Sequence, residues 1–250
     1  MDFAIRRLGP QAAGDERGPD DPGGELLEKG AAFDGVGETH GELVVNGWKF
    51  DKSDGAKTTC AQAAAAQLSA PMSTTSTPAV FLDRDGTLME EAHYCSHPDQ
   101  VRIIPGVPEA LRALKDVGYR LVIITNQSGI GRGYYTLQDY ETVQAHFLGL
   151  LGDGLIDGTY FCPEAPEAAS PRRKPETGMV VEAQRDLGLD LARSWFIGDK
   201  RVDVQCGLRA GMRPILVLTG HGAKEDASGA EFVAKDFASA VAFILKTSDA

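Results

Sequence analysis

The sequence is poor in the features that mark membrane-spanning, secreted or nucleic-acid-coating proteins. Its four cysteines are scattered and include no Cys-x-x-Cys pair, so we expect no disulfide framework and a reducing compartment. No apolar run approaches the roughly 18 residues that a membrane span needs. The N-terminus also lacks the apolar core of a secretory signal. We therefore expect a cytoplasmic protein.

Basic residues are scarce as well. The 25 Lys and Arg residues are outnumbered by 36 Asp and Glu residues, and the net charge is -11. Because phosphate backbones and anionic lipids attract clustered Lys and Arg, we expect no binding to nucleic acid or membranes. A small anionic metabolite is compatible with this charge, since a divalent cation and a few basic groups can reverse the potential inside one pocket.

Two regions of different composition divide the chain. Residues 1–77 are low in complexity, rich in Gly, Asp, Glu and Pro, and cannot bury enough apolar surface to offset their chain entropy. We expect this N-terminal extension to be largely irregular, with a short hairpin around Asn46-Gly47. Residues 78–250 form the predicted folded domain. Met72 lies shortly before it and is a candidate start of the functional protein.

The second region alternates apolar runs with amphipathic segments, the pattern of a parallel sheet with helices on both faces. The expected fold is α/β, with three layers, a doubly wound parallel sheet and no cap domain. The glycine-rich residues 129–135 are expected to form a loop. The predicted strands cover residues 79–82, 119–124, 158–162, 195–197, 214–218 and 232–233. The predicted helices cover residues 107–117, 137–151, 177–187, 202–210 and 237–245.

Four polar clusters follow or lie near the apolar runs and should meet at one edge of this sheet. In the first cluster, Asp83 and Asp85 stand two residues apart directly after a strand, and Gly86 permits a sharp turn there. Carboxylates can act as nucleophiles that form aspartyl-phosphates. Two neighbouring carboxylates repel each other unless a hard cation such as Mg²⁺ holds both.

The second cluster supplies neutral hydrogen-bonding groups. Thr125 ends the second predicted strand and should arrive beside Asp83, because ligands of doubly wound sheets bind at the strand ends. Its hydroxyl can hold a phosphoryl oxygen, and the following residues extend the donor set: Asn126, Gln127 and Ser128.

The last two clusters supply cations and further carboxylates. Arg173 and Lys174 are adjacent, and Lys suits charge neutralisation whereas Arg suits bidentate recognition. Asp199 follows the fourth predicted strand, where it can bind a cation. Asp203, one helical turn further on, is a candidate second carboxylate, and Lys200 lies between them.

Together, D-R-D-G-T-L, T-N-Q-S-G-I-G-R-G-Y-Y, R-K-P-x-x-G-M and G-D-K-x-x-D resemble the phosphatases of the haloacid dehalogenase (HAD) superfamily. They are most similar to its capless branch of D-glycero-D-manno-heptose 1,7-bisphosphate phosphatases and histidinol-phosphatases. The resemblance covers about residues 78–222. It implies that Asp83 is the nucleophile and Asp85 the general acid and base. It also implies a Mg²⁺ ion held by Asp83, the backbone carbonyl of Asp85 and Asp199, supported by the Lys200 backbone and Asp203.

The same resemblance implies further roles. Thr125 and Lys174 would act on the transferring phosphoryl group. The substrate-binding residues that it implies are Glu91, His93 and Tyr94 after the first cluster, with Asn126, Gln127, Ser128, Arg132 and Arg173.

The chain departs from this branch in one loop. Many members hold a structural zinc with Cys-x-His and a later Cys-x-Cys pair. Here Cys162 is followed by Glu164 at the His position, and Ser170 and Arg172 replace the later pair. Because one soft ligand cannot build a closed tetrahedral site, we predict no zinc.

The sequence thus predicts a monomeric, Mg²⁺-dependent phosphomonoesterase that hydrolyses a small sugar phosphate or bisphosphate through an aspartyl-phosphate. Histidinol phosphate is the nearest alternative substrate. A DNA 3′-phosphatase shares a similar T-N-Q…G-x-G-R-G loop, but the acidic charge argues against it. A noncatalytic binding module is the alternative from another class, and the intact Asp83, Asp85, Lys174 and Asp199 argue against it.

Overall fold

The computed structural model describes residues 38–39, 42–45, 48–51 and 76–248. The chain divides into two units between residues 73 and 74, and each is described by itself. The first unit contains an antiparallel sheet of β1 (Glu38–Thr39), β2 (Glu42–Val45) and β3 (Trp48–Asp51). β2 and β3 flank Asn46-Gly47, with Val45 paired to Trp48. The turn itself, Met72 and the rest of residues 1–75 lie outside the described residues.

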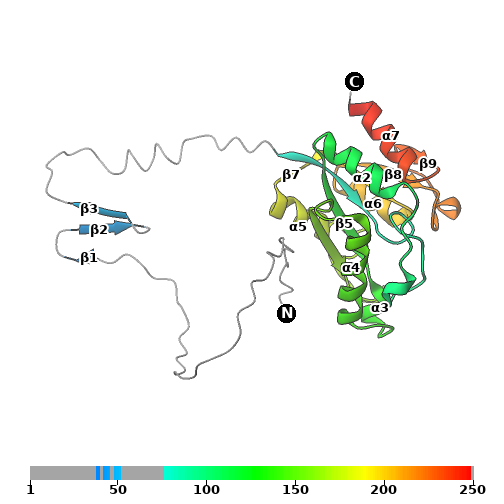
Figure 1. Cartoon of the computed structure of the whole chain (residues 1–250), viewed down its shortest axis with the longest axis horizontal. Coiled ribbons are helices and arrows are strands. Elements are labelled where there is room, and N and C mark those ends of the chain that lie inside the picture. The colour runs from blue at the N-terminus through cyan, green and yellow to red at the C-terminus, as the bar shows by residue number, and fades with distance from the viewer. Residues whose placement is uncertain (1–37, 40–41, 46–47, 52–75, 249–250) are drawn as a thin grey trace, which may run out of the picture. The chain divides into compact units, whose positions relative to one another are not determined.

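The second unit, coloured from cyan to red in Figure 1, is built on a parallel sheet. This sheet has six strands in the order β6-β5-β4-β7-β8-β9. The first strand of this unit, β4, therefore lies near the middle of the sheet, and later strands are added on both sides of it. The strands are β4 (Thr77–Leu82), β5 (Arg120–Asn126), β6 (Gly158–Cys162), β7 (Leu189–Gly198), β8 (Arg213–Val217) and β9 (Phe232–Ala234).

Helices cover the sheet and connect its strands. Among the described residues, none of them has the length and apolarity to cross a bilayer. They are α2 (Val107–Asp116), α3 (Ser128–Gly131), α4 (Leu137–Leu151), α5 (Gly178–Leu187), α6 (Arg201–Arg209) and α7 (Phe237–Ser248), with two single 3₁₀ turns, η1 (Pro98–Gln100) and η2 (Gly222–Lys224).

Strand β4 is buried on both faces, and its alternate side chains pack into two separate hydrophobic cores. Val80 and Leu82 belong to the core formed with α2, α4 and α7. Ala79 and Phe81 belong to the core formed with α5 and α6. This two-sided burial explains why the strands read as continuous apolar runs rather than as alternating ones. The predicted three-layer, doubly wound fold is confirmed.

Some element bounds differ from the sequence prediction. β7 begins at Leu189, earlier than the predicted residue 195, because Leu189 pairs with Thr77 at the start of β4. The pairing is irregular between Pro78 and Val80. There the backbone N–H of Ala79 donates to Oγ of Ser194 at 2.8 Å, which satisfies a group that the ladder leaves unpaired.

The prediction of a loop over residues 129–135 was wrong in part, because helix α3 occupies its first half. Glycine disfavours helices, but tertiary contact selects this single turn. The backbone N–H of Gly131 donates to the carbonyl of Pro163 at 2.9 Å. A Cβ at Gly131 would lie 2.6 Å from the backbone nitrogen of Ala165, so the close approach requires glycine at this position.

Sheet register brings the polar clusters together. Leu82 pairs with Ile123 of β5 on one side and with Ile197 of β7 on the other. Parallel strands end at one edge, so the residues that follow β4 and β7 and those that end β5 share that edge. This is the geometry from which the site is built.

Candidate active site

Lys174 links two of the carboxylates that were predicted to act together. Its Nζ lies 2.8 Å from Oδ1 of Asp83 and 2.7 Å from Oδ1 of Asp203. The third contact of Nζ is to the carbonyl oxygen of Ile124 at 2.8 Å. Burial acts to lower the pKa of Lys174, but the charges of Asp203 and Asp83 outweigh it and raise that pKa above its ordinary value. The lysine is therefore a fixed positive charge.

Three buried carboxylates form a cluster that includes both partners of Lys174. Asp83, Asp199 and Asp203 each place an oxygen within 4.8 Å of the others. Burial and the charge of Asp83 raise the pKa of Asp199 to about 8, and burial raises the pKa of Asp203 to about 6. Burial acts on Asp83 in the same direction, but the charges of Lys174 and Lys200 prevail and lower its pKa. Asp83 is thus kept ionised, as a nucleophile must be.

Asp199 has the surroundings that best fit a cation. Its Oδ2 accepts a hydrogen bond from the backbone N–H of His221 at 2.8 Å. Its Oδ1 is buried without a hydrogen-bond partner among the described residues. A Cβ at Gly86, whose φ is +82°, would lie 2.3 Å from Oδ2 of Asp199, so the turn after β4 needs glycine. The oxygens of Asp83 and Asp199 fit a hard divalent cation.

Asp203 serves a different purpose from Asp199. Its Oδ1 is paired with Lys174, and its Oδ2 accepts the backbone N–H of Lys200 at 3.0 Å. Both oxygens are therefore engaged within the protein. These contacts indicate that Asp203 orients Lys174.

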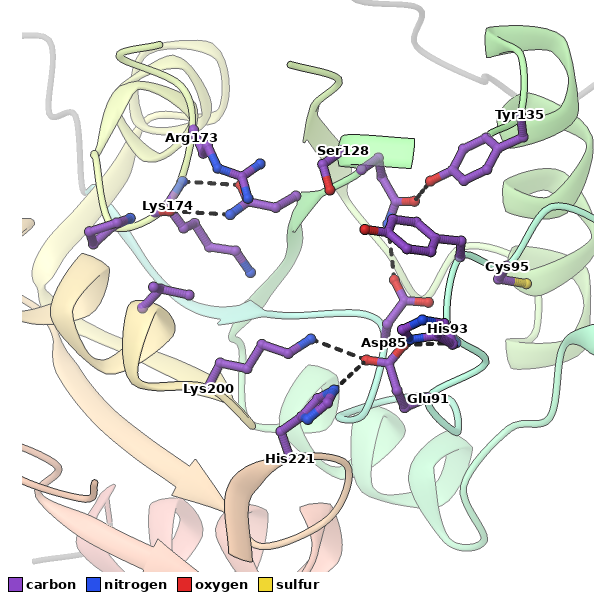
Figure 2. Close-up of a pocket in the computed structure, with 15 residues that line it drawn as sticks. Asp85, Glu91, His93, Cys95, Ser128, Tyr135, Arg173, Lys174, Lys200 and His221 are labelled. Carbon is purple, nitrogen blue, oxygen red and sulfur yellow. Dashed lines mark hydrogen bonds and ion pairs between the residues drawn. The ribbon is translucent and has the colours of Figure 1, made fainter. Parts of the chain in front are cut away.

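Two adjoining cavities open at the edge of the sheet. A recess of about 40 Å³ is lined by the groups predicted to perform the chemistry, including Asp83, Asp85, Thr125 and Lys174. A larger pocket of about 560 Å³, drawn in Figure 2, has the size of a small-molecule site. Asp85 lines both cavities. It therefore stands at the junction of the two cavities.

Seven of the eight predicted substrate-binding residues line the larger pocket, all except Arg132. Arg132 instead pairs with Glu167 at 3.0 Å. Asn126 lines the pocket but is also bound to the chain: its amide exchanges hydrogen bonds with the backbone N–H and carbonyl of Lys174 at 3.1 and 3.2 Å. Asn126 therefore fixes the segment that presents Lys174. Arg173 lines the pocket while its Nη1 donates to the carbonyl of Glu164 at 3.1 Å.

The loop after the first cluster forms one wall of the pocket. Glu91 accepts from the backbone N–H of His93 with Oε1 and pairs through Oε2 with Lys200 at 3.1 Å (Figure 2). His93 and Tyr94 have φ values of 47° and 68°, which non-glycine residues seldom adopt. The ring of Tyr94 meets the ring of Tyr134 edge to face, with centroids 4.7 Å apart. The wall is thus anchored at both ends.

Sequence reasoning missed several residues of the site. His221 lines the pocket, and its Nε2 lies 3.4 Å from Oε2 of Glu91. It follows strand β8 by four residues, at the same sheet edge as Asp199, and this position was the signal available for finding it. Tyr135 and Cys95 also line the pocket. Their positions depend on loops whose paths no periodicity encodes.

The loop at Cys162 is held by hydrogen bonds. The Cys162 thiol donates to Oε2 of Glu164 at 2.9 Å, and Ser170 lies at 4.0 Å from the sulfur. Burial and the Glu164 carboxylate raise the pKa of Cys162 to about 11. Among the described residues, the one group of three or more potential metal ligands is the cluster of Asp83, Asp199 and Asp203.

Comparison with known proteins agrees with this geometry. A family model described as HAD-hydrolase-like matches residues 171–240. The chain is 38% identical over 186 residues to the D-glycero-D-manno-heptose-1,7-bisphosphate 7-phosphatase of Thermosynechococcus vestitus, covering 67% of this chain and 95% of that protein. It is 42% identical over 149 residues to the D-glycero-beta-D-manno-heptose-1,7-bisphosphate 7-phosphatase of Helicobacter pylori strain J99, covering 58% of this chain and 85% of that protein.

A solved structure is similar over the same extent. The D,D-heptose 1,7-bisphosphate phosphatase of B. bronchiseptica, crystallised with magnesium and phosphate, has a TM-score of 0.64 and 30% identity. The match covers 68% of this chain and 99% of that one. Fold and site thus define a HAD-type hydrolase. Within that superfamily, the chain belongs to the family of the D-glycero-D-manno-heptose-1,7-bisphosphate 7-phosphatases.

Proposed function

We propose that this chain is a Mg²⁺-dependent phosphomonoesterase acting on a sugar bisphosphate, as D-glycero-D-manno-heptose 1,7-bisphosphate 7-phosphatases do. The observation that carries the proposal is the 2.8 Å ion pair of Asp83 with Lys174, beside the buried Oδ1 of Asp199, which has no hydrogen-bond partner in the part of the chain that the structure describes. A nucleophile, a counter-charge and a cation ligand then converge on one recess. The names of the relatives from T. vestitus and H. pylori supply the substrate class.

Asp83 and Asp85 divide the reaction between them. A carboxylate oxygen of Asp83 attacks phosphorus while the bond from phosphorus to the ester oxygen breaks, and Asp85 gives its proton to that oxygen. The sugar alcohol leaves, and an aspartyl-phosphate remains on Asp83. Asp85, now a carboxylate, takes a proton from water as the water oxygen bonds to phosphorus and the bond to Asp83 breaks. Inorganic phosphate leaves, and both aspartates return to their initial states.

Lys174 and Thr125 act on the transferring phosphoryl group. The three donors of Lys174 are taken by Asp83, Asp203 and a carbonyl, so it contributes as a positive point charge. Thr125 accepts from Gln127 through Oγ1, which leaves its own hydroxyl hydrogen for a phosphoryl oxygen. Asp83, Asp199 and the carbonyl of Asp85 would hold Mg²⁺, which would supply Lewis-acid stabilisation of the phosphoryl charge.

Two other substrates are less well supported. Histidinol phosphate carries an ammonium group that needs an acidic partner, but both oxygens of Glu91 are engaged by Lys200 and the His93 backbone. A DNA 3′-phosphate end needs basic residues around the pocket mouth. Arg132 is instead paired with Glu167, and the net charge of the chain is -11.

The domain and compartment follow from the same proposal. We assign the activity to residues 78–250, which contain both cavities. We also propose a cytoplasmic location, because Cys95, Cys162 and Cys206 are free and buried, as is usual in a reducing compartment.

Phosphate release with and without Mg²⁺ tests the proposal. The substrates are D-glycero-D-manno-heptose 1,7-bisphosphate, histidinol phosphate and a 3′-phosphorylated oligonucleotide. We expect release of one phosphate from the heptose bisphosphate, loss of activity in EDTA and recovery on adding Mg²⁺. Asp83→Asn should lower kcat by at least about a thousandfold with an unchanged circular dichroism spectrum. Full activity of that variant, or a preference for either other substrate, would contradict the proposal.

A further inference from the structure

Arg84, which lies between the two predicted catalytic aspartates, is completely buried. Its guanidinium makes a bidentate contact with the neighbouring carboxylate of Asp85. Nε lies 3.0 Å from Oδ2, and Nη2 lies 3.1 Å from Oδ1. The proposed reaction makes no direct use of Arg84. Because removing a guanidinium from water is costly even when it is paired, fold stability alone gives little reason for an ion pair here.

Gln127 holds the same carboxylate from a second direction. Its Nε2 donates to Oδ2 of Asp85 at 2.9 Å and to Oγ1 of Thr125 at 2.8 Å. Its Oε1 accepts from the Tyr135 hydroxyl at 2.7 Å and from Nη2 of Arg84 at 3.3 Å. The two donors and two lone pairs of the amide are all used, so it can take only one orientation. This leaves no free polar group on Gln127 for substrate.

The far side of Arg84 is also fixed. Nη1 donates to Oε1 of Gln144 at 3.1 Å, and the guanidinium carbon lies 5.6 Å from the centroid of the Tyr140 ring. A planar guanidinium with partners on several edges cannot rotate without breaking contacts. The Asp85 carboxylate is consequently held by a rigid set of side chains, although it lines two cavities and is 17% exposed.

We propose that Arg84, together with Gln127, is a positioning residue that sets the orientation of the Asp85 carboxylate at the junction of the two cavities. The inference rests on the proposed function, in which Asp85 gives a proton to the leaving alcohol and later takes one from water. Both transfers need the carboxylate oxygen within hydrogen-bond reach of the oxygen that reacts. Arg84 is buried and lines neither cavity, so it acts through Asp85. Gln127 belongs to the same set: it lines the larger pocket, but its amide is occupied by Asp85, Thr125, Tyr135 and Arg84.

The leaving group separates positioning of Asp85 from a general structural role. A sugar alcohol needs a proton as it leaves, whereas 2,4-dinitrophenolate does not. With Asp85 misplaced, attack by Asp83 on 2,4-dinitrophenyl phosphate should proceed, but hydrolysis of the aspartyl-phosphate should be slow. The result is a burst of about one dinitrophenolate per chain followed by slow turnover, the signature of an accumulating covalent intermediate.

The test uses the full chain with Arg84→Lys, which keeps the positive charge but cannot make the bidentate contact with Asp85. For the heptose bisphosphate we expect kcat to fall by about a hundredfold, within the usual range for general acid-base catalysis, and KM to change little. For 2,4-dinitrophenyl phosphate we expect the burst. Gln127→Met removes the second contact without adding charge and should give the same burst with a smaller fall in kcat. This second variant decides the question if Arg84→Lys does not fold.

Arg213→Lys is the matched control, because Arg213 also pairs with a carboxylate, Glu231, and lies 3.8 Å over the Trp195 ring, at the opposite end of the sheet. It should show normal kcat and no burst. An equal loss on both substrates without a burst, or unchanged kinetics in Arg84→Lys and Gln127→Met, would overturn the positioning role. Failure of the proposed function looks different: the wild-type protein would release no phosphate from any ester, or Asp83→Asn would stay active.

Discussion

Lys200 Nζ lies 3.1 Å from Oε2 of Glu91, so the turn that carries Asp199 is bound directly to the loop that walls the pocket. Glu91 also accepts the backbone N–H of His93, the first of two consecutive non-glycine residues with positive φ. Burial acts to raise the pKa of Glu91, but the charge of Lys200 outweighs it and lowers that pKa. The unusual backbone of the wall is thus maintained by an ionised carboxylate that is bound to the turn carrying Asp199.

Glu91→Gln should weaken substrate binding more than chemistry. The amide can still accept from His93 but loses the charge that holds Lys200, and an ion pair this accessible is worth about 1 kcal/mol. We therefore expect KM for the heptose bisphosphate to rise about fivefold, with a smaller change in kcat. Glu109→Gln, in the exposed pair with Arg112, is the matched control and should alter neither constant. A fall in kcat without a change in KM would contradict this assignment.

Asp199→Asn should separate metal binding from fold stability. Without a cation, burial and the charge of Asp83 disfavour ionised Asp199 and raise its pKa to about 8. At neutral pH the wild type must therefore take up a proton or carry a disfavoured charge when it folds. The neutral amide avoids this cost, so the metal-free melting temperature should rise by about 2–4 °C. Mg²⁺ should raise the melting temperature of the wild type and have little effect on the variant, because a ligand stabilises only the fold that binds it.

Thermal unfolding with EDTA and with excess Mg²⁺ provides the measurement. Asp99→Asn is the control, since that side chain is 90% exposed and does not belong to the carboxylate cluster. It should keep the wild-type response to Mg²⁺. An equal Mg²⁺ response in Asp199→Asn would mean that the cation binds elsewhere.

The convergence of the motifs could be predicted from the sequence because it depends on few physical facts. Apolar runs of strand length, each followed by Asp83, Thr125 or Asp199, place those residues at one edge of any parallel sheet. The register of Leu82 with Ile123 and Ile197 then aligns them. Lys174 has no such strand, and its position came from resemblance to a family rather than from periodicity.

The supporting contacts could not be predicted in the same way. Arg84 is charged and lies in a turn, so composition favours exposure, yet it is buried by Gln127, Gln144 and Tyr140 from distant segments. His221 had no spacing typical of a metal or catalytic histidine. Helix α3 forms despite its glycine content because the close approach of Gly131 to Pro163 determines the backbone conformation there. Each of these depends on tertiary contacts.

Metal analysis of the purified protein should find no stoichiometric zinc. Cys162 is the single soft donor in its loop, and it donates to Glu164 as a thiol whose pKa is raised to about 11. Zinc binding needs several donors and a thiolate. Cys162→Ser keeps a hydrogen-bond donor and should lower the free energy of unfolding by about 1 kcal/mol, a typical value for one altered hydrogen bond. About one zinc per chain, with its loss in Cys162→Ser, would show that the loop is a metal site.

Asp157 should contribute stability that disappears in acid. Its carboxylate is 9% exposed and binds Lys115 Nζ at 2.8 Å, Arg120 Nη1 at 2.7 Å and the backbone N–H of Leu121 at 2.8 Å. These contacts link α2 and the start of β5 to the segment that precedes β6. Burial acts to raise its pKa, but these partners prevail and lower it below 3.8. A depressed folded-state pKa means that the stabilisation is complete above the unfolded pKa, near 4, and is lost as pH falls through the folded value.

Asp157→Asn should therefore be less stable than the wild type at pH 7, by about 2 kcal/mol, since the partly exposed Lys115 and Arg120 limit the effect. Urea unfolding at pH 7 and near pH 3 measures the difference, which should shrink toward zero at the lower pH. Asp153 is exposed, so Asp153→Asn is the matched control. Its free energy of unfolding should equal that of the wild type at both pH values. A difference for Asp157→Asn that stays constant with pH would show that the amide disturbs packing, because lost packing does not depend on protonation of the wild-type carboxylate.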